Sequence, residues 1–266
     1  MKNILVINKY NEVLDSFAQK VINHLESLNC NVEIYNEKET YTNKDLAVVI
    51  GGDGTMLGAA RNIGVNGIPL IGINTGRIGF LTDISKDSVF EKLSECISGQ
   101  YVTEKRDVLS IKLYNKNELI EENIAINDFF VYCSNARKLI EISLFINDEF
   151  VYNQYVDGLI VATATGSSAY SLSAGGSIVN PNIPIFNIVP VSAQNLSIRP
   201  LIISNNDKIK LLVSNKEKIS YTNDGLDAKE ISNNSYFIIE KHVRDFELYH
   251  PKDYSYYGNI RNKLNW

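Results

Sequence analysis

Residues 46–57 read Leu-Ala-Val-Val-Ile-Gly-Gly-Asp-Gly-Thr-Met-Leu, five apolar residues that end in three glycines around one aspartate. A short run with branched side chains is typical of a strand buried on both faces of a parallel sheet, with helices above and below. The glycines let the chain turn sharply and approach a ligand closely, and Thr55 begins an expected helix. Backbone N–H groups and a helix N-terminus then meet at one point, which favours phosphate.

Asp53 is the unusual residue of this turn, because a carboxylate repels a phosphate unless another group lies between them. A metal ion would remove the repulsion, and a hydroxyl group that attacks the phosphate would give the carboxylate a function. Both roles belong to phosphoryl transfer. The alternative is that Asp53 only caps the helix that follows.

Residues 1–99 alternate between strand-like and helix-like stretches. Apolar residues at spacings of three and four predict a helix that is capped by Asn11 and runs to about Leu28. The polar stretch Asn-Thr-Gly-Arg at 74–77 follows a strand candidate, as the glycine turn does, and in such sheets ligands gather at strand ends. The pattern predicts an α/β domain over residues 1–100 with a doubly wound parallel sheet. The strand candidates are 4–7, 32–34, 46–50 and 68–73.

From about residue 101 the spacing of apolar residues changes to two. Asn147-Asp148, between two such runs, is a hairpin signal. The pattern predicts an all-β domain of two packed sheets over residues 101–250, followed by a tail at 251–266. The strand candidates are 108–114, 119–126, 128–133, 138–146, 149–155, 208–213, 219–221 and 236–239.

The chain of 266 residues has a globular composition, with 44% hydrophobic and 21% charged residues and a net charge of −5. Negative charge without a concentrated basic patch argues against nucleic acid as a partner. No stretch approaches the ~20 apolar residues that span a bilayer, so no membrane partner is expected. Three widely spaced cysteines form neither a zinc pattern nor a disulfide framework, which favours the cytoplasm. The three scattered histidines predict no metal site.

Residues 157–176 read Asp-Gly-Leu-Ile-Val-Ala-Thr-Ala-Thr-Gly-Ser-Ser-Ala-Tyr-Ser-Leu-Ser-Ala-Gly-Gly. Small residues let a backbone come close to a flat ligand, and hydroxyl groups can read the edges of a base or a ribose. Tyr170 can stack on a base, an interaction of about 1–3 kcal/mol in nucleic-acid complexes. A tightly packed turn and short helix, in which Ser and Thr satisfy backbone groups, explains the same composition.

Several motifs resemble those of one enzyme family. Gly-Gly-Asp-Gly-Thr at 51–55 is similar to the signature of a superfamily that contains NAD kinases, diacylglycerol and sphingosine kinases and, more distantly, 6-phosphofructokinases. Residues 157–176 resemble an NAD kinase motif, with Ala164 where proline is usual and Ser168 where threonine is common. Asn127-Asp128 matches the family's Asn-Glu pair with a shorter acid. Further similar stretches are 74–81, the partial match Ser-Ile-Arg-Pro at 197–200, His-Pro-x-x-Tyr at 250–254 and Leu-Asn-Trp at 264–266.

The resemblance implies a bacterial NAD kinase, which uses ATP and Mg²⁺ to phosphorylate NAD at the 2′-hydroxyl of its adenosine ribose. Asp53 is then the catalytic residue, which accepts the hydroxyl proton late in a loose transition state. Arg77 helps to neutralise the triphosphate, although a plain ion pair explains it equally well. Self-association to a dimer or tetramer is also implied. The residues expected to bind NAD or ATP are Gly52, Gly54, Thr55, Asn74, Arg77, Asn127, Asp128, Asp157, Thr165, Ser168, Ala169, Tyr170 and Ser173, and no direct metal ligand is assigned.

Three rival functions stay open at this point. A lipid kinase of the diacylglycerol or sphingosine type needs an apolar acceptor channel or a membrane-binding surface. A sugar-phosphate kinase of the phosphofructokinase type predicts α/β alternation throughout, and a dinucleotide sensor predicts NAD binding without turnover. The stretch Asn-Asp-Gly at 223–225 resembles a late element near the family's site and also fits a tight β-turn, which we favour.

Overall fold

The computed structural model describes residues 1–8, 15–76, 79–135, 138–214, 218–232 and 235–266. It divides into two compact units. Met1–Arg106 and Arg244–Trp266 form the first unit, and Asp107–Val243 form the second. Each unit is described by itself below.

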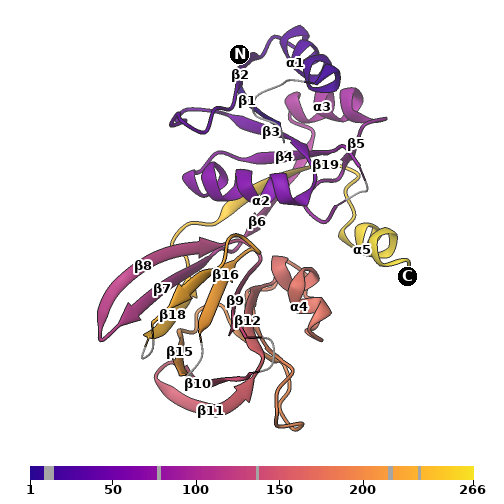
Figure 1. Ribbon diagram of the computed structural model, residues 1–266. Coiled ribbons are helices and arrows are strands. Elements are labelled where there is room, and N and C mark those ends of the chain that lie inside the picture. The colour runs from indigo at the N-terminus through magenta and orange to yellow at the C-terminus, as the bar shows by residue number, and fades with distance from the viewer. Residues whose placement is uncertain (9–14, 77–78, 136–137, 215–217, 233–234) are drawn as a thin grey trace. The chain divides into compact units, whose positions relative to one another are not determined.

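The first unit is a sheet with helices on both faces (Figure 1). Its strands are β1 (Asn3–Asn8), β2 (Asn31–Ile34), β3 (Leu46–Gly51), β4 (Leu70–Asn74), β5 (Ile84–Ser85), β6 (Tyr101–Arg106) and β19 (Phe246–Pro251). Its helices are α1 (Ser16–Ser27), α2 (Asp53–Asn62), the short 3₁₀ helix η1 (Gly64–Asn66), α3 (Val89–Ile97) and α5 (Tyr256–Leu264). The sheet order is β2-β1-β3-β4-β19-β6, with β5 beside β4. All these pairs are parallel except β19 with β6, so the predicted α/β fold is confirmed with a mixed sheet.

The central strands β3 and β4 are buried along their whole length, as continuous apolar runs require in a sheet covered on both faces. Alternate side chains of β1, β3 and β4 form one hydrophobic core with α1 and α3. Helix α2 lies on the other side of the sheet (Figure 1). The apolar run at 46–50 therefore decides the layering, because both of its faces need a cover.

Helix α1 begins one turn later than the sequence suggests. Its N-cap is Asp15, whose carboxylate accepts a hydrogen bond of 2.7 Å from the backbone N–H of Ala18. The predicted cap, Asn11, lies outside the described residues. Aspartate and asparagine are equally good N-cap residues, because the side-chain oxygen of either accepts a hydrogen bond from a free N–H of the first helical turn.

The predicted domain boundaries of 1–100, 101–250 and 251–266 need correction. Residues 101–106 form β6, which pairs with β19 along its whole length at the edge of the first sheet. The all-β unit is therefore Asp107–Val243, and the tail belongs to the first unit. The physical reason is that β19 returns to the first sheet, where it pairs in parallel with β4 at Leu70 and provides the partner of β6.

The second unit consists of two antiparallel sheets of six strands each. Their inner faces share one hydrophobic core, which confirms the predicted two-sheet domain. One sheet has the order β11-β10-β15-β18-β7-β8 and the other β14-β13-β12-β9-β16-β17. The strands are β7 (Leu109–Asn115), β8 (Glu118–Ala125), β9 (Asp128–Cys133), β10 (Ile140–Ile146), β11 (Glu149–Val156), β12 (Gly158–Thr163), β13 (Ile185–Val191), β14 (Leu201–Ser204), β15 (Ile209–Ser214), β16 (Ile219–Asn223), β17 (Lys229–Ile231) and β18 (Ser235–Lys241). Two short helices follow β12, namely η2 (Thr165–Ser168) and α4 (Tyr170–Ser173).

The predicted hairpin at Asn147-Asp148 joins β10 to β11. Both residues have positive φ, 51° and 66°, as a two-residue hairpin turn requires. Asparagine and aspartate tolerate this conformation better than most residues. The register of β10 against β11 is thus fixed locally, by two residues.

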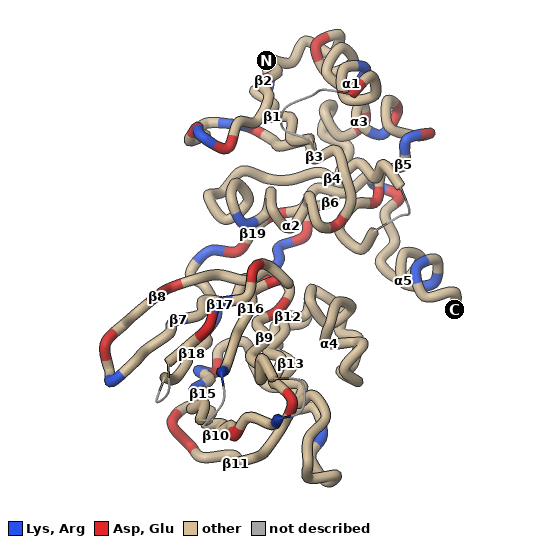
Figure 2. The backbone as a smooth tube through the Cα atoms, in the orientation of Figure 1, with Lys and Arg blue, Asp and Glu red and all other residues tan. Residues whose placement is uncertain are grey.

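Charged side chains of both signs lie interspersed over the described elements of both units (Figure 2). Several form ion pairs across neighbouring elements, such as Lys44 with Glu33 and Lys218 with Glu230. Among the helices whose residues are described, none combines the length and the apolar character needed to cross a bilayer.

Candidate active site

The glycine turn after β3 is shaped by its own side chains. A Cβ on Gly51 would overlap the hydroxyl of Thr55, so only glycine fits there. Gly52 is the extended N-cap residue of α2, and Asp53 is the first residue of the helix. The free N–H groups of the first helical turn therefore follow directly on the end of the strand, which favours an anion.

Asp53 does not cap α2. Its carboxylate accepts hydrogen bonds from the backbone N–H groups of Phe80 and Leu81, at 2.9 and 3.1 Å, and from the hydroxyl of Thr82 at 3.3 Å. Two of these donors share Oδ1 and one binds Oδ2, whereas a carboxylate has about four acceptor sites. Oδ2 thus accepts one of the three bonds and Oδ1 accepts two. The capping alternative is wrong, because the N-cap of α2 is Gly52 and Asp53 is the first residue of the helix.

Asn74 supports the loop that supplies these donors. Its side chain is buried, donates to Thr82 Oγ1 at 2.9 Å and accepts from the backbone N–H of Gly76 at 2.7 Å. Asn74 thus orients the hydroxyl that binds Asp53 and uses both of its amide atoms to do so. Arg77, the other site residue predicted in this stretch, lies outside the described residues.

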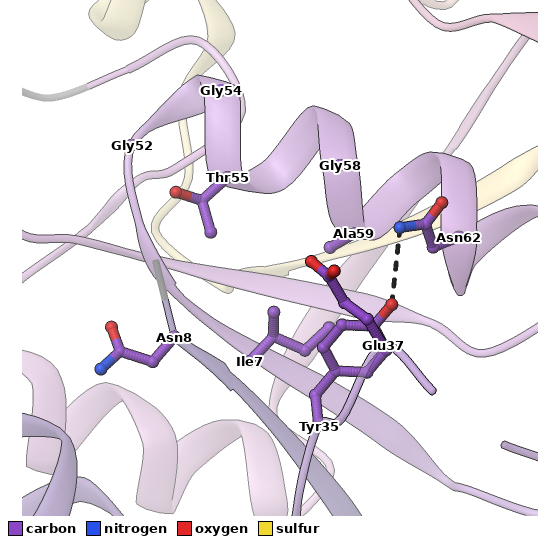
Figure 3. A pocket seen from close by; sticks show the side chains of 10 residues that line it. All are labelled: Ile7, Asn8, Tyr35, Glu37, Gly52, Gly54, Thr55, Gly58, Ala59 and Asn62. Atoms are coloured by element: carbon purple, nitrogen blue, oxygen red, sulfur yellow. Dashed lines mark hydrogen bonds between the residues drawn. The ribbon is translucent and has the colours of Figure 1, made fainter. Parts of the chain in front are cut away.

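A pocket of about 410 Å³ is lined in part by the glycine turn (Figure 3). The predicted residues Gly52, Gly54 and Thr55 line it. The sequence reasoning missed the remaining lining residues, which come from the ends of β1 and β2 and from α2: Ile7, Asn8, Tyr35, Glu37, Gly58, Ala59 and Asn62. The available signal was that β1 and β2 belong to the same parallel sheet as β3, and ligands gather at the carboxyl ends of such strands.

In the second unit, Asn127 and Asp128 lie beside the end of β12. Asp128 pairs with Ala162 in the sheet, and the hydroxyl of Thr163 donates to the backbone oxygen of Ile126 at 2.7 Å. A Cβ on Gly166 would overlap the backbone of Asn127, so the chain approaches here as closely as glycine allows. The stretch read as small and hydroxyl-rich is therefore a buried strand followed by a tight helical turn that holds Asn127 and Asp128.

Asp224 is more than a turn residue, which corrects our preference for a plain β-turn. Its φ is 52° and that of Gly225 is 69°, so the turn is real. Its carboxylate also accepts from the backbone N–H groups of Ile126, Asn127 and Asp128, with shortest distances of 2.9, 2.6 and 3.1 Å. Asp224 therefore fixes the Asn127-Asp128 segment from the turn after β16, almost one hundred residues away along the chain.

Asp128 is buried, with a side chain beside Asp224. Burial and the negative charge of Asp224 raise the pKa of Asp128 to about 7, and a hydrogen bond from the backbone of Tyr170 opposes them. A carboxyl group that titrates near neutrality can change its charge when a ligand supplies or removes hydrogen-bond donors.

The raised pKa of Asp128 predicts a pH-dependent stability. Folded protein holds the proton up to a pH of about 7, whereas unfolded protein loses it near 3.8. The stabilisation present at low pH is therefore lost as pH rises through about 7. We expect Asp128→Asn to gain unfolding free energy relative to wild type between pH 5 and 8, on the order of 2–4 kcal/mol. Urea unfolding at several pH values measures this difference, and a pH-independent difference would contradict the raised pKa.

Tyr170 offers an open aromatic surface beside this cluster. Its ring is 45% exposed and meets Phe130 edge-on, with centroids 5.1 Å apart at 84°. Phe130 in turn stacks on Tyr132 at 4.8 Å. The contact with Phe130 supports the Tyr170 ring from the side while solvent reaches the rest of it.

The other predicted residues of this stretch differ in burial and in position. Thr165 is buried, Ser168 and Ala169 are partly buried next to Tyr170, and Ser173 is exposed on α4. Asp157 lies at the opposite end of β12 from Asp128, where its backbone pairs with Val191. The structure thus gathers Thr165, Ser168 and Ala169 around Tyr170 and leaves Asp157 apart from them.

The described parts of the chain contain no group of three or more His, Cys, Asp or Glu side chains that could hold a metal ion. The carboxylates at the glycine turn and its pocket belong to Asp53 and Glu37. Any metal ion there needs oxygen ligands from a bound phosphate as well.

Comparisons with known proteins point to one family. The model of the ATP-NAD kinase N-terminal domain matches residues 4–101, and that of the ATP-NAD kinase C-terminal domain matches residues 126–250. The NAD kinase of Thiobacillus denitrificans is 41% identical over 231 residues, 87% of this chain and 80% of that protein. The NAD kinase of Pseudoalteromonas translucida is 42% identical over 224 residues, 84% of this chain and 76% of that protein.

Two solved structures share the fold. Yeast NADH kinase complexed with NADH has a TM-score of 0.88 at 24% identity and covers 100% of this chain and 88% of its own. An NAD kinase from Archaeoglobus fulgidus in complex with ATP has a TM-score of 0.79 at 24% identity, covering 98% and 99%. These matches give no support to the lipid kinase alternative. Because both family models match and the curated relatives are 41% and 42% identical over most of its length, the chain belongs to the NAD kinase family of phosphotransferases.

Proposed function

We propose that this enzyme transfers the γ-phosphoryl group of ATP, bound with Mg²⁺, to the 2′-hydroxyl of the adenosine ribose of NAD, giving ADP and NADP. The observation that carries the proposal is the Asp53 carboxylate, which is held by Phe80, Leu81 and Thr82 beside an anion-favouring turn. A carboxylate held this way serves a reaction in which a hydroxyl attacks a phosphate.

The pocket beside the turn suits the phosphates and base of ATP. Its floor contains Gly52, Gly54 and Thr55 at the start of α2, where N–H groups favour phosphate. Neither Gly52 nor Gly54 has a neighbouring atom within 4 Å of where a Cβ would stand, so these positions leave room for a ligand. Tyr35 lines the same pocket, where its hydroxyl accepts a hydrogen bond from the side chain of Asn62 (Figure 3). A structural relative forms a complex with ATP.

Mg²⁺ fits this pocket as a companion of the triphosphate. In kinase sites the ion is bound by one or two carboxylates together with substrate phosphates and water. The carboxylate of Glu37 and the hydroxyl of Thr55 line the pocket and supply oxygen donors of this kind. Bound there, the ion would neutralise charge on the transferred group.

Asp53 would act on the acceptor hydroxyl. A ribose hydroxyl is far less acidic than a carboxylic acid, so Asp53 takes its proton only as the bond to phosphorus forms. The three donors on the carboxylate hold its oxygen atoms in place before the reaction begins. Correct placement of the hydroxyl and the phosphate supplies most of the acceleration in phosphoryl transfer.

The dinucleotide would be bound by the cluster of the second unit. Asp128 and Asn127 offer groups that can bind ribose hydroxyls or base edges, and the exposed ring of Tyr170 can stack on a base. One structural relative forms a complex with NADH.

Removal of the Tyr170 ring is expected to weaken NAD binding more than ATP binding. A stacked base contributes about 1–3 kcal/mol, so Tyr170→Ala should raise the Kd for NAD roughly 5- to 150-fold. Tyr257→Ala is the control, because Tyr257 is exposed on α5 outside both clusters. Calorimetric titration with each nucleotide measures both constants. Equal losses for NAD and ATP would contradict the stacking role.

Self-association to a dimer or tetramer is part of the proposal. Strands β8 and β11 are the two edges of one sheet, and unpaired edges favour pairing with another chain. Exposed apolar side chains on these strands support it: Leu119, Ile120, Phe150 and Val151. Analytical ultracentrifugation of the whole protein tests it, and a monomer at micromolar concentration would contradict it.

The enzyme would work in a reducing compartment, the cytoplasm. Its three cysteines, Cys30, Cys96 and Cys133, are all free thiols and buried. Burial raises the pKa of Cys30 and raises that of Cys96 to about 11, so neither thiol is reactive.

A coupled assay tests the proposed reaction. Purified protein is incubated with NAD, ATP and Mg²⁺, and NADP is detected by a dehydrogenase that uses NADP alone. We expect NADP formation that requires all three components. NAD binding without turnover would favour the sensor reading, and phosphorylation of a diacylglycerol in place of NAD would favour a lipid kinase.

A further inference from the structure

His250 lies in a buried cluster of charged side chains in the first unit. Its side chain is 1% exposed, and its Nδ1 lies 3.0 Å from Asp83 Oδ2. Its Nε2 lies 3.4 Å from a carboxylate oxygen of Glu104, and the same carboxylate pairs with the guanidinium of Arg106. The side chains of these three partners are 8%, 12% and 3% exposed. The cluster draws on three elements. His250 comes from β19, Asp83 from the loop before β5, and Glu104 and Arg106 from β6.

The cluster is electrically neutral when His250 carries a proton, since two acids then face two bases. Burial alone lowers the pKa of His250, but hydrogen bonds and charges from Asp83 and Glu104 outweigh it and hold the pKa above 6.5. Burial likewise raises the pKa of Glu104, and His250 and Arg106 hold it below its ordinary value. Loss of the proton would leave a buried negative charge without a partner, which is unfavourable.

Three further titratable groups lie near His250 and its partners. The ring of Tyr254 stacks on the imidazole with centroids 3.9 Å apart at 15°. Cys96 on α3 lies close enough to Asp83 to feel its charge, and Tyr256 on α5 is close enough to feel Glu104 and Arg106. Burial raises the pKa of each of these three groups, so they stay uncharged at neutral pH. The charge state of the cluster therefore changes at His250 first.

Asp83 connects this cluster to Asp53. It directly follows Thr82, the last of the three groups that donate to the Asp53 carboxylate. The loop is tight, because the N–H of Gly79 bonds to the backbone oxygen of Thr82 at 3.2 Å. The same end of the loop is held twice, by Asn74 through the hydroxyl of Thr82 and by His250 through the carboxylate of Asp83. The ionic cluster thus anchors the segment that aims the catalytic carboxylate.

We propose that His250 is a positioning residue for phosphoryl transfer, which holds Asp83 and thereby fixes the loop at residues 79–82 that orients Asp53. This inference rests on the proposed function for its catalytic consequence, but not for its structural part. It gives the stretch His-Pro-x-x-Tyr at 250–254 a role in the reaction, although His250 touches no substrate-binding residue named above. The alternative is that the cluster only stabilises the fold.

Four variants separate these roles. His250→Asn keeps a donor where Nδ1 faces Asp83, His250→Gln keeps one where Nε2 faces Glu104, and Asp83→Asn alters the partner. His24→Gln is the matched control, because His24 lies in the same unit and bonds to Phe90 and Ser94 on α3. Circular dichroism and thermal unfolding identify any variant that does not fold, and the folded ones carry the test.

Hydrogen exchange, read by mass spectrometry on peptides that contain Phe80 and Leu81, reports the loop directly. We expect these amides to exchange at least 10-fold faster in His250→Gln and Asp83→Asn than in wild type, with a smaller change in His250→Asn. At saturating NAD and ATP, kcat should fall at least 10-fold in His250→Gln while both KM values change less than 3-fold. His24→Gln should match wild type in exchange and in kinetics.

The pH profile adds a readout that a merely structural role would not move. Because the pKa of His250 is raised by folding, the stabilisation is complete below 6.5 and is lost as pH rises through the folded pKa. Wild-type kcat at saturating substrates should therefore fall on this alkaline limb, and His250→Asn should lack it. Asp128, whose pKa is about 7, also titrates in this range, so the loss of the limb in His250→Asn is what assigns it to His250.

Each outcome decides between the roles. Faster loop exchange with unchanged kcat would overturn the positioning role, and so would reduced kcat with unchanged exchange. A His250→Asn enzyme with the wild-type alkaline limb would overturn it as well. Should wild type form no NADP, the proposed function fails, and the exchange data alone still decide whether His250 fixes the loop.

Discussion

Replacement of Asp53 by asparagine is expected to lower kcat for NADP formation by a factor of about 10²–10⁴, the range for loss of a general base. The amide cannot accept the proton of the ribose hydroxyl. It also cannot accept hydrogen bonds on both of its terminal atoms, so at least one donor among Phe80, Leu81 and Thr82 loses its partner. The unfolding free energy should fall by about 1–3 kcal/mol for that reason. Steady-state kinetics and urea unfolding measure the two effects.

A pair of glycine variants separates the presence of the carboxylate from its orientation. A Cβ on Gly79 would overlap Asp53 Oδ1, whereas a Cβ on Gly76, three residues earlier, meets no atom within 4 Å. Gly79→Ala should therefore displace the carboxylate and reduce kcat although Asp53 is present. Gly76→Ala is the control. It adds a methyl group to the same part of the chain without displacing the carboxylate, so its stability and kcat give the effect of the methyl group alone.

The Asp53 prediction has a definite contrary result. An Asp53→Asn enzyme with kcat within threefold of wild type would remove Asp53 from the proton transfer. A Gly79→Ala enzyme with normal kcat and normal stability would show that the orientation of the carboxylate has no influence on the rate. NAD and ATP affinities, measured in parallel, should change little in Asp53→Asn, because the contacts that bind each nucleotide are retained.

Replacement of Asp224 by alanine is expected to reduce the unfolding free energy by about 3 kcal/mol or more. Its carboxylate satisfies the backbone N–H groups of Ile126, Asn127 and Asp128, and an unsatisfied buried donor costs about 1–3 kcal/mol. Release of the Asn127-Asp128 segment should also weaken NAD binding at least tenfold. Removal of the neighbouring charge should lower the pKa of Asp128.

Asp148→Ala is the control for this variant. Asp148 also occupies a hairpin turn with positive φ, 66° against 52° for Asp224, so alanine meets the same backbone strain of about 1–2 kcal/mol at both sites. The Asp148 carboxylate, however, is exposed and pairs with Lys208 at 3.5 Å. Chemical unfolding and NAD titration compare the two variants. Equal losses of stability and no loss of NAD affinity would mean that Asp224 is only a turn residue.

The sequence was sufficient where the controlling interactions are local. The apolar run at 46–50 must be covered on both faces. Position 51 must be glycine, because any larger side chain would overlap Thr55. The hairpin at Asn147-Asp148 depends on two residues that tolerate positive φ. From residue 108 onward apolar residues recur at every second position, because successive side chains of a strand point to opposite faces. This alternation predicts sheets with one buried face, as the two sheets have.

The sequence was insufficient where partners are far apart along the chain. Strand β6 is polar because it is an edge strand, and its pairing with β19 joins residues more than one hundred positions apart. Asp224 reaches residues 126–128 over a similar separation, so its aspartate-glycine stretch looked like a turn alone. The motif also grouped Asp157 with Tyr170 in one site. A sequence motif does not show that the strand β12 separates the two residues in space. Pocket residues Asn8 and Tyr35 carry no local signal.

The most direct test of the account is the position of the phosphate in the product. Wild-type enzyme is incubated with NAD, ATP and Mg²⁺, and the product is examined by two-dimensional ³¹P–¹H NMR. The account predicts one new phosphomonoester signal coupled to H2′ of the adenosine ribose, formed with an equal amount of ADP. A phosphomonoester coupled to H3′ or to the other ribose, or ADP release without a phosphomonoester, would contradict it.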